Sequence, residues 1–461
     1  MTDYYISRFI TRRDSVMAST QEQSGSTPVG VVPPSIDRKT AMQVARASFT
    51  GTAIEWYDYF LYGSAAALVF PQVFFSGLGT TAALLASFAT FGVAFLFRPL
   101  GGIIFGHFGD KMSRKQALVI TLLIMGIGTF AIGLLPTTSQ VGILAPILLV
   151  ILRLVQGIGL GGEWGGAALM VVEHAPAGKR GIYGVACQLG VPAGQLASAG
   201  ILALMAAILP SEDFLSWGWR VPFLFSGALV LVGLYIRAKV PESPKFLAIK
   251  AANKQPKLPI SEVFRYAKKT TLLLIFVQAA STVGYYLFTV YSLSYVATDL
   301  KLPREWALTG VLVGAGLLLV AMPLYALLSD KIGRRPVYAA GTLFIGLYAV
   351  PFFWLLDTRN SVLVIVGIAA AIVFGYGPTG ALHGPLYAEQ YPTRYRYTGA
   401  SVAYQFSSMV AGAPAALVAG ALVAATGTTM AVSWYVIGAA VISLLCVFFL
   451  KETYRADLTK E

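Results

Sequence analysis

The stretch GHFGDKMSRK at residues 106–115 recurs in part as SDKIGRR at residues 329–335. In both copies a Lys directly follows the Asp, and an Arg lies four positions after it. A second motif, Glu-x-x-Pro-x-x-x-Arg, starts at Glu173 and again at Glu389. The two motifs recur at offsets of 220 and 216 residues. We therefore predict a duplicated unit whose two copies run in parallel, an architecture found in secondary transporters.

Long apolar runs surround these motifs. The chain is 56% hydrophobic and only 12% charged, with a mean hydropathy of +0.70. A soluble protein of this composition could not cover its surface with polar groups. Twelve runs are long enough to cross a bilayer core of about 30 Å: 47–70, 82–107, 116–136, 143–168, 183–209, 218–238, 271–297, 307–328, 336–356, 361–384, 398–425 and 429–450. The expected fold is an all-α integral membrane protein of twelve transmembrane helices in two pseudo-symmetric six-helix bundles.

This pattern divides the chain into five segments. We expect a disordered N-terminal tail at 1–46, helix bundles at 47–238 and 271–450, a linker at 239–270 and a short tail at 451–461. If both termini are cytoplasmic, 28 of the 34 Lys and Arg residues lie in cytoplasmic segments and four in the opposite loops. This bias places both termini inside the cell, in a multi-pass plasma (inner) membrane protein. It also explains the net charge of +13 without a nucleic-acid partner.

The charges of the repeated motifs are placed against their local helix dipoles. Asp110 follows a predicted helix C-terminus and Arg114 precedes a predicted N-terminus, where each charge is disfavoured. We expect such residues to have partners across the interface between the halves and to act as a gate. The alternative is that they are ordinary topogenic charges, which accounts for the Lys and Arg better than for the Asp. The predicted gating residues are Asp110, Arg114, Glu173, Arg180, Asp330, Arg334, Glu389 and Arg396.

At this point the sequence resembles the major facilitator superfamily, and within it the metabolite:proton symporter family. The resemblance rests on GTAIEWYDY (51–59), FRPLGG (97–102), RLVQG (153–157), GGEWGG (161–166) and PTRYRYTG (392–399). It implies alternating-access uptake of a small polar metabolite with protons, closest to carriers of shikimate or related carboxylates. A proline- or betaine-type zwitterion carrier is the alternative, and a non-transporting sensor is disfavoured. The short C-terminal tail disfavours an osmosensing role.

The sequence departs from the family pattern at three positions. Glu55 stands where shikimate-type carriers often have Asp, Ser113 where the loop motif has Gly, and Ala326 where the second copy would begin with Gly. The last departure weakens the expectation that the second loop acts as a gate.

Five ionisable residues fall inside predicted spans of the first half and away from the span ends, where charges are costly and usually functional. Glu55 and Asp58 are three residues apart and share a helix face. We expect them, together with Glu163, to couple transport to protons, although structural ion pairs are the alternative. For Glu163 that alternative pairs it with Arg98. Arg98 and Arg153 are predicted to bind the substrate, because a guanidinium grips a carboxylate with two hydrogen bonds. The alternatives are a gating role for Arg98 and a fixed structural ion pair for Arg153.

Neutral polar residues in otherwise apolar spans are the remaining candidates for the substrate site, with interhelical hydrogen bonding as the alternative role. They are Gln188, Gln195, Gln278, Tyr285, Tyr286, Tyr404 and Gln405. In the second half Ala369 and Thr379 stand at the positions of Arg153 and Glu163, so we expect proton coupling mainly in the first half. The sequence contains no motif for an enzyme, a metal or a nucleotide. We expect no cofactor beyond the proton gradient, and partners limited to the organic substrate, protons and the bilayer around a monomer.

Overall fold

The computed structural model describes residues 38–176, 178–251 and 259–456, and all of them belong to one compact unit. The expected tail over residues 1–37 lies outside the described residues. The first helix begins at Arg38, before the expected start at residue 47. The chain from Arg38 to the end of the predicted tail at residue 46 is therefore helical.

Six long helices come from the first half of the chain. They are α2 (Arg38–Leu68), α4 (Thr80–Lys111), α5 (Arg114–Leu134), α7 (Leu144–His174), α8 (Arg180–Ile208) and α10 (Arg220–Ala238). The short α3 (Phe70–Val73), α6 (Thr138–Val141), α9 (Ser211–Asp213) and the π-helical turn η1 (Phe214–Gly218) connect them.

Six more membrane-length elements come from the second half. Three are unbroken: α16 (Arg304–Ile332), α17 (Arg334–Asp357) and α23 (Met430–Phe449). The other three contain short π-helical turns (η2, η3, η4 and η6). The first of them consists of α13 (Lys268–Val277), α14 (Ala279–Tyr286), η2 (Leu287–Tyr291), α15 (Ser292–Ser294) and η3 (Tyr295–Asp299). The second consists of α18 (Ser361–Ala370), η4 (Ala371–Tyr376), α19 (Gly377–Gly380) and α20 (His383–Glu389), and the third of α21 (Arg396–Ser407), η6 (Ser408–Gly412) and α22 (Ala415–Thr426). The 3₁₀ turn η5 (Thr393–Tyr395) precedes α21. Such turns widen a helix locally and are frequent at functional sites.

Within the described residues, eleven helices are long and apolar enough to cross a membrane. The first predicted span lies in the remaining long helix, α2, which carries Glu55 and Asp58 among its buried residues. Leu347 and Leu417 are 70% and 76% exposed, as expected for side chains that face lipid. The helical membrane architecture predicted from the sequence is confirmed.

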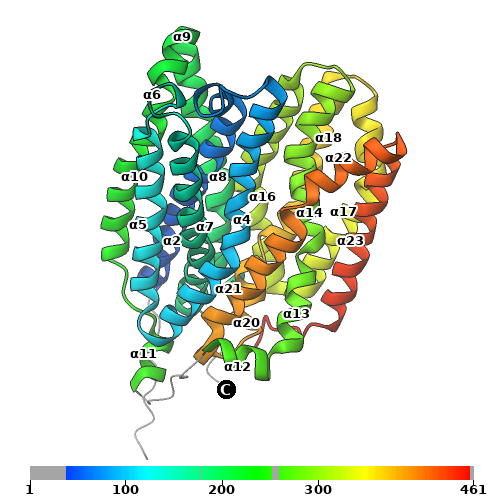
Figure 1. Cartoon of the computed structure of the whole chain (residues 1–461). Coiled ribbons are helices and arrows are strands. Elements are labelled where there is room, and N and C mark those ends of the chain that lie inside the picture. The colour runs from blue at the N-terminus through cyan, green and yellow to red at the C-terminus, as the bar shows by residue number, and fades with distance from the viewer. Residues whose placement is uncertain (1–37, 177, 252–258, 457–461) are drawn as a thin grey trace, which may run out of the picture. The chain divides into compact units, whose positions relative to one another are not determined.

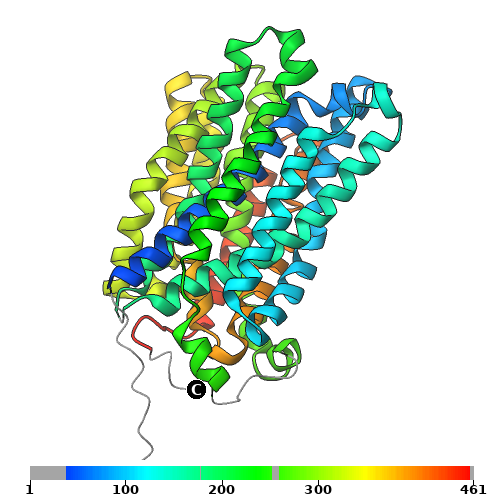
Figure 2. The same ribbon diagram turned by 90° about the vertical axis from the view of Figure 1, so that its left-hand side faces the viewer.

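The helices run between two ends of the molecule. We call the end where α2 begins and α23 ends the base (Figure 1). In Figure 1, α5 and α10 lie on the left, while α17 and α23 lie on the right. The rotated view in Figure 2 shows α2, in blue, crossing the bundle obliquely from the base. The predicted linker contains α11 (Pro244–Ala251) and α12 (Pro259–Tyr266), both at the base.

Two sets of helices meet through a few elements. α2 packs on α8, α4 on α7 and α5 on α10, while α17 packs on α23 and α16 on α18. Contacts between the sets are made by α4, α7 and α8 with α16, α20 and α21. Within the first set, glycines allow α4 and α7 to approach closely, because a side chain at Gly161 of α7 would overlap the backbone of Arg98 in α4. The same packing brings the charged residues of α4 and α7 together.

Candidate functional site

The acidic residues of α2 lie in the interior of the first set of helices. Glu55 and Asp58 are 2% and 1% exposed. Asp58 accepts a hydrogen bond of 2.6 Å from the Ser226 hydroxyl of α10. Arg153 of α7 is a charged neighbour of Asp58, and the Oε2 atom of Glu55 has no hydrogen-bond partner among the described residues. Two carboxylates are therefore buried on one face of α2 with little direct compensation.

Arg153 contacts one polar side chain, Gln156, and a group of aromatic rings. Its Nη1 atom donates to Oε1 of Gln156 at 3.0 Å, and Gln156 donates to the Thr129 hydroxyl at 2.8 Å. The Cζ atom of Arg153 lies 3.7 Å from the centroid of the Tyr62 ring, a cation–π contact. Its Nε and Nη2 atoms have no hydrogen-bond partner among the described residues.

Arg98 of α4 also packs against aromatic rings, one of which, Tyr59, is shared with Arg153. Its Cζ atom lies 4.2 Å from the centroid of Phe95 and 4.9 Å from that of Tyr59. Tyr59 also lies 5.9 Å from the Cζ atom of Arg153, so it separates the two guanidinium groups. The Nε and Nη2 atoms of Arg98 are likewise buried without a hydrogen-bond partner among the residues described. The two arginines together offer open donors of the kind that bind a carboxylate.

Glu163 does not pair with Arg98, so that alternative interpretation was wrong. Its Oε1 atom instead forms an ion pair with Nη2 of Arg237, near the end of α10. Arg237 lies one residue before the end of the predicted span at 218–238 and was not among the predicted site residues. The side chain turns inward and also donates to the backbone oxygen of Leu118. The partner of Arg237 is a buried acid 74 residues away in another helix, and sequence spacing does not reveal such a pairing.

The neutral candidates divide into two groups. Gln188 accepts a hydrogen bond of 2.7 Å from Trp164, whose ring stacks on Tyr404 at 3.6 Å, and Gln188 lies 3.3 Å from Nδ1 of His383. Tyr285 donates to Gln195 at 3.3 Å. These pairs join the first and second halves of the chain at the centre of the structure.

The remaining candidates lie around or below that centre. The Tyr286 ring packs edge-on against Phe95, beside Arg98. Gln405 donates to the backbone oxygen of Gly161 at 3.1 Å, which leaves its own Oε1 atom buried without a partner among the described residues. Gln278 accepts a hydrogen bond of 3.0 Å from Tyr387, away from the two arginines.

The repeated motifs form a first charge network at the base. Asp110 accepts hydrogen bonds from the backbone N–H groups of Tyr397 and Thr398, at 3.2 and 2.9 Å, in the first turn of α21. Glu173 forms ion pairs with Arg114 and, at 3.0 Å, with Arg396. The Asp that is disfavoured at its own helix C-terminus thus caps the N-terminus of a helix from the other half.

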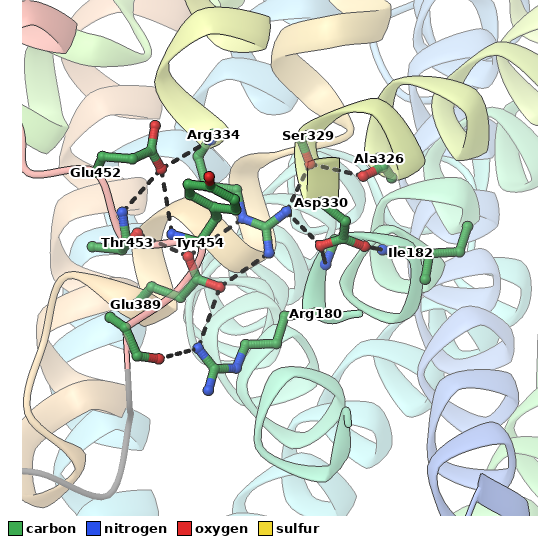
Figure 3. Close-up of polar contacts among 12 residues, drawn as sticks. Arg180, Ile182, Ala326, Ser329, Asp330, Arg334, Glu389, Glu452, Thr453 and Tyr454 are labelled. Atoms are coloured by element: carbon green, nitrogen blue, oxygen red, sulfur yellow. Dashed lines mark hydrogen bonds and ion pairs between the residues drawn. The ribbon is translucent and has the colours of Figure 1, made fainter. Parts of the chain in front are cut away.

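A second network repeats this arrangement with the halves exchanged (Figure 3). Asp330 accepts hydrogen bonds from the backbone N–H groups of Gly181 and Ile182, at 2.8 and 3.0 Å, in the first turn of α8. Arg334 lies 2.7 Å from Asp330 and 3.2 Å from Glu389, and Arg180 lies 3.9 Å from Glu389. The eight predicted gating residues therefore lie in two pseudo-symmetric clusters that bridge the halves.

A third repeat, which the sequence analysis missed, completes both networks. Glu242 accepts from the Ser113 hydroxyl at 2.5 Å, and Ser243 donates to Glu173. At the corresponding place after the last helix, Glu452 accepts from the backbone N–H groups of Arg334 and Arg335, both at 2.9 Å, and Thr453 donates to Glu389 at 2.8 Å. The pairs Glu242–Ser243 and Glu452–Thr453 are separated by 210 residues. That spacing, close to the other two offsets, was the signal that could have found them.

Within the described part of the chain, no group of three or more His, Cys, Asp or Glu side chains is arranged to hold a metal ion.

Comparison with known proteins assigns the family. Residues 49–416 match the Major Facilitator Superfamily. The chain belongs to this superfamily. The transporter is 40% identical over 448 residues to the shikimate transporter of Escherichia coli strain K12, covering 96% of this chain and 100% of that protein. It is 42% identical over 427 residues to the inner membrane metabolite transport protein YhjE of the same strain, covering 90% and 95%.

This Major Facilitator Superfamily protein is similar to two further known proteins. It is 34% identical to the proline/betaine transporter of Salmonella typhimurium strain LT2, covering 92% of this chain and 86% of that protein. The fold is similar to that of the proton:xylose symporter XylE, with a TM-score of 0.75, 18% identity, and coverage of 92% of this chain and 98% of that structure. The protein is a multi-pass plasma-membrane transporter of small molecules, not an enzyme.

Proposed function

We propose that this transporter imports a small organic acid, such as shikimate or a related carboxylate, together with protons. The observation that carries the proposal is the pair of buried guanidinium groups of Arg98 and Arg153, whose Nε and Nη2 donors have no partner among the described residues. Buried charges without compensation are strongly destabilising. A substrate carboxylate would supply both the negative charge and the acceptors that these donors need.

The position of Asp58 supports proton coupling. Its carboxyl group is buried near Arg153, whose positive charge stabilises the ionised form. A substrate carboxylate that binds Arg153 would cancel this stabilisation and favour the uptake of a proton by Asp58. Release of the substrate would restore the positive charge and expel the proton. Substrate and proton would then move in the same direction, as symport requires.

The two base networks support alternating access. The excess of Lys and Arg in the base loops supports a cytoplasmic position for the base. Asp110 and Asp330 each cap a helix from the other half, and Glu173 and Glu389 each contact an arginine from the other half. Separation of the halves at the base must break these contacts, so the networks would act as the cytoplasmic gate.

A proline- or betaine-type zwitterion is the alternative substrate class, and several relatives carry such names. Quaternary amines are bound by open aromatic faces. Here the rings of Tyr62, Phe95 and Tyr59 are covered by the guanidinium groups of Arg153 and Arg98. The central site therefore favours a negatively charged substrate.

The test is uptake of labelled shikimate by cells expressing the chain at acidic external pH, with and without a protonophore. We expect accumulation that the protonophore abolishes. If the protein is shown to be in the membrane and the cells still take up no shikimate, shikimate is excluded as the substrate. A panel of other carboxylates and betaines would then identify the substrate class.

A further inference from the structure

One face of α2 forms a polar track from the base to the central site. Ser48, Gly51, Glu55 and Asp58 follow one another at intervals of three or four residues, which places them on the same side of the helix. All four are buried, and together they span about 15 Å of helix at 1.5 Å per residue. Asp58, the proposed proton-coupling residue, stands at the inner end of this track, and Ser48 stands at the end nearest the base.

Arg237 crosses the track at Gly51. A β-carbon at Gly51 would collide with the guanidinium group, so the glycine makes the room in which Arg237 lies. The guanidinium is bonded on both sides, by Nη2 to Glu163 and by Nη1 to the backbone oxygen of Leu118. Glu163 is 0% exposed, and its Oε2 atom has no hydrogen-bond partner among the described residues. Arg237 thus holds one oxygen of this carboxyl group and leaves the other open.

A small cavity lies on the base side of Arg237. Its volume is about 30 Å³, and its polar lining comes from Ser48, Lys115 and Arg237. Val44 and Val240, near the base ends of α2 and α10, also line it. About 10–15 Å³ is enough for one water molecule, so the cavity has room for one, and Ser48, Lys115 and Arg237 are the polar partners in an otherwise apolar lining. The ion pair of Glu163 is therefore one side chain, Arg237, away from a water-sized space.

We propose that protons leave the central site along this track, from Asp58 through Glu55 and Glu163 to water in the cavity, and that Arg237 is the positioning residue of the route. The inference rests on the proton coupling proposed above and specifies its path to the cytoplasmic side. In each step a carboxylic acid transfers its proton to a neighbouring carboxylate or, at the end, to water, so no other reactant is needed.

The surroundings of Glu163 fit this role. The titratable, charged or hydrogen-bonding groups that face it from the packed helices are Glu55 and Asp58 of α2, Thr121 of α5, Cys187 of α8, Arg237 of α10 and Tyr397 of α21. Arg237 is the cation directly bonded to Glu163 within this set. Unlike Arg98 and Arg153, it donates from both Nη atoms to protein acceptors, which suits a positioning residue better than a substrate ligand.

The test compares two activities of the purified full chain in proteoliposomes, with labelled shikimate as the probe. The first is accumulation driven by an imposed proton gradient, and the second is counterflow without a gradient, which needs no net proton release. The variants are Arg237→Gln, Arg237→Lys and Gly51→Ala, which displaces Arg237 without changing any charge. Lys239→Gln, an exposed cation two residues further on, is the matched control.

Arg237→Gln should lower gradient-driven accumulation by about tenfold or more, because an uncompensated Glu163 charge is left buried, and should keep most of the counterflow. Arg237→Lys should recover part of the accumulation. Gly51→Ala should also lose accumulation while keeping counterflow, but to a smaller extent than Arg237→Gln. Lys239→Gln should match the wild type in both activities. Unchanged accumulation in Arg237→Gln would overturn the route. A parallel loss of both activities would also overturn it, by showing a general structural role.

If the wild type carries shikimate in neither assay, the proposed substrate fails and the route is tested directly. In a Cys446→Ala background, Ser48→Cys should react with a small water-soluble thiol reagent applied from the base side, because the route requires water at this position. The native Cys187 is 0% exposed and should stay unlabelled. Absence of labelling at position 48 in the folded protein would exclude the route independently of the substrate.

Discussion

The Oε1 atom of Glu173 lies 3.0 Å from Nη1 of Arg396, whereas the corresponding atoms of Glu389 and Arg180 are 3.9 Å apart. Arg180 instead donates from Nη1 to the backbone oxygen of Ala456 at 2.7 Å. The two base networks are therefore built from equivalent residues but are not equally tight. One crossing between the halves is a close charge pair, and the other is shared with the chain segment after α23.

This asymmetry predicts different costs for two matched substitutions. Glu173→Gln leaves both Arg114 and Arg396 without their close anion, and the remaining Asp110 contact of Arg114 is 3.7 Å long. Glu389→Gln leaves Arg334 its 2.7 Å contact with Asp330. We expect Glu173→Gln to lose about 3 kcal/mol of stability and Glu389→Gln clearly less. Thermal unfolding of the purified protein measures the difference. Equal losses would show that the shorter ion pair, Glu173–Arg396, does not stabilise the protein more than Glu389–Arg180.

Asp58→Asn should separate exchange from proton-driven uptake. Asn keeps an oxygen that can accept the hydrogen bond from Ser226 but cannot bind and release a proton. We expect counterflow to persist while accumulation against a gradient is lost. Ser226→Ala is the control, because it removes the hydrogen bond at a cost of about 1 kcal/mol and leaves the carboxyl group. Proton-driven accumulation by Asp58→Asn would rule out Asp58 as the coupling residue.

Arg153→Lys should weaken substrate binding although it keeps the charge. A lysine cannot form the two-pronged contact with a carboxylate, and it loses the planar packing on Tyr62. We expect the apparent affinity for the transported acid to fall about tenfold or more, as for the loss of one charge-assisted hydrogen bond. Concentration dependence of uptake measures this, with the exposed Arg304→Lys as the control. An unaltered affinity would exclude the arginine clamp.

Gly161→Ala should damage the helix contact that positions Arg98. The added methyl group would overlap the backbone carbonyl of Arg98, and backbone atoms cannot move aside cheaply. We expect a loss of about 1–3 kcal/mol in stability, with a lower yield of folded protein. Gly92→Ala in α4 is the control, because nothing lies within 4 Å of its added carbon. Similar thermal unfolding of the two variants would contradict close packing at Gly161.

Most of the fold followed from local patterns in the sequence. The apolar runs predicted the membrane helices, and the expected start at 47 differed from Arg38 because the first turns of α2 are polar enough to resemble a tail. The mismatch between Asp110 and its local helix dipole indicated a distant partner, and the structure places that partner at Thr398. These inferences succeeded because hydrophobic length and helix dipoles are properties of single segments.

Pairing between distant side chains did not follow from the sequence. Arg98 and Arg237 are both cations of the first half, and Glu163 is bonded to Arg237 and not to Arg98. The rotation of α10 about its axis and the absence of a side chain at Gly51 decide that pairing. The sequence by itself determined the membrane helices, the duplication and most of the buried charges, because these depend on composition and spacing. Only the tertiary structure decided which charges neutralise one another, because that depends on distances of a few ångströms between helices far apart in the chain.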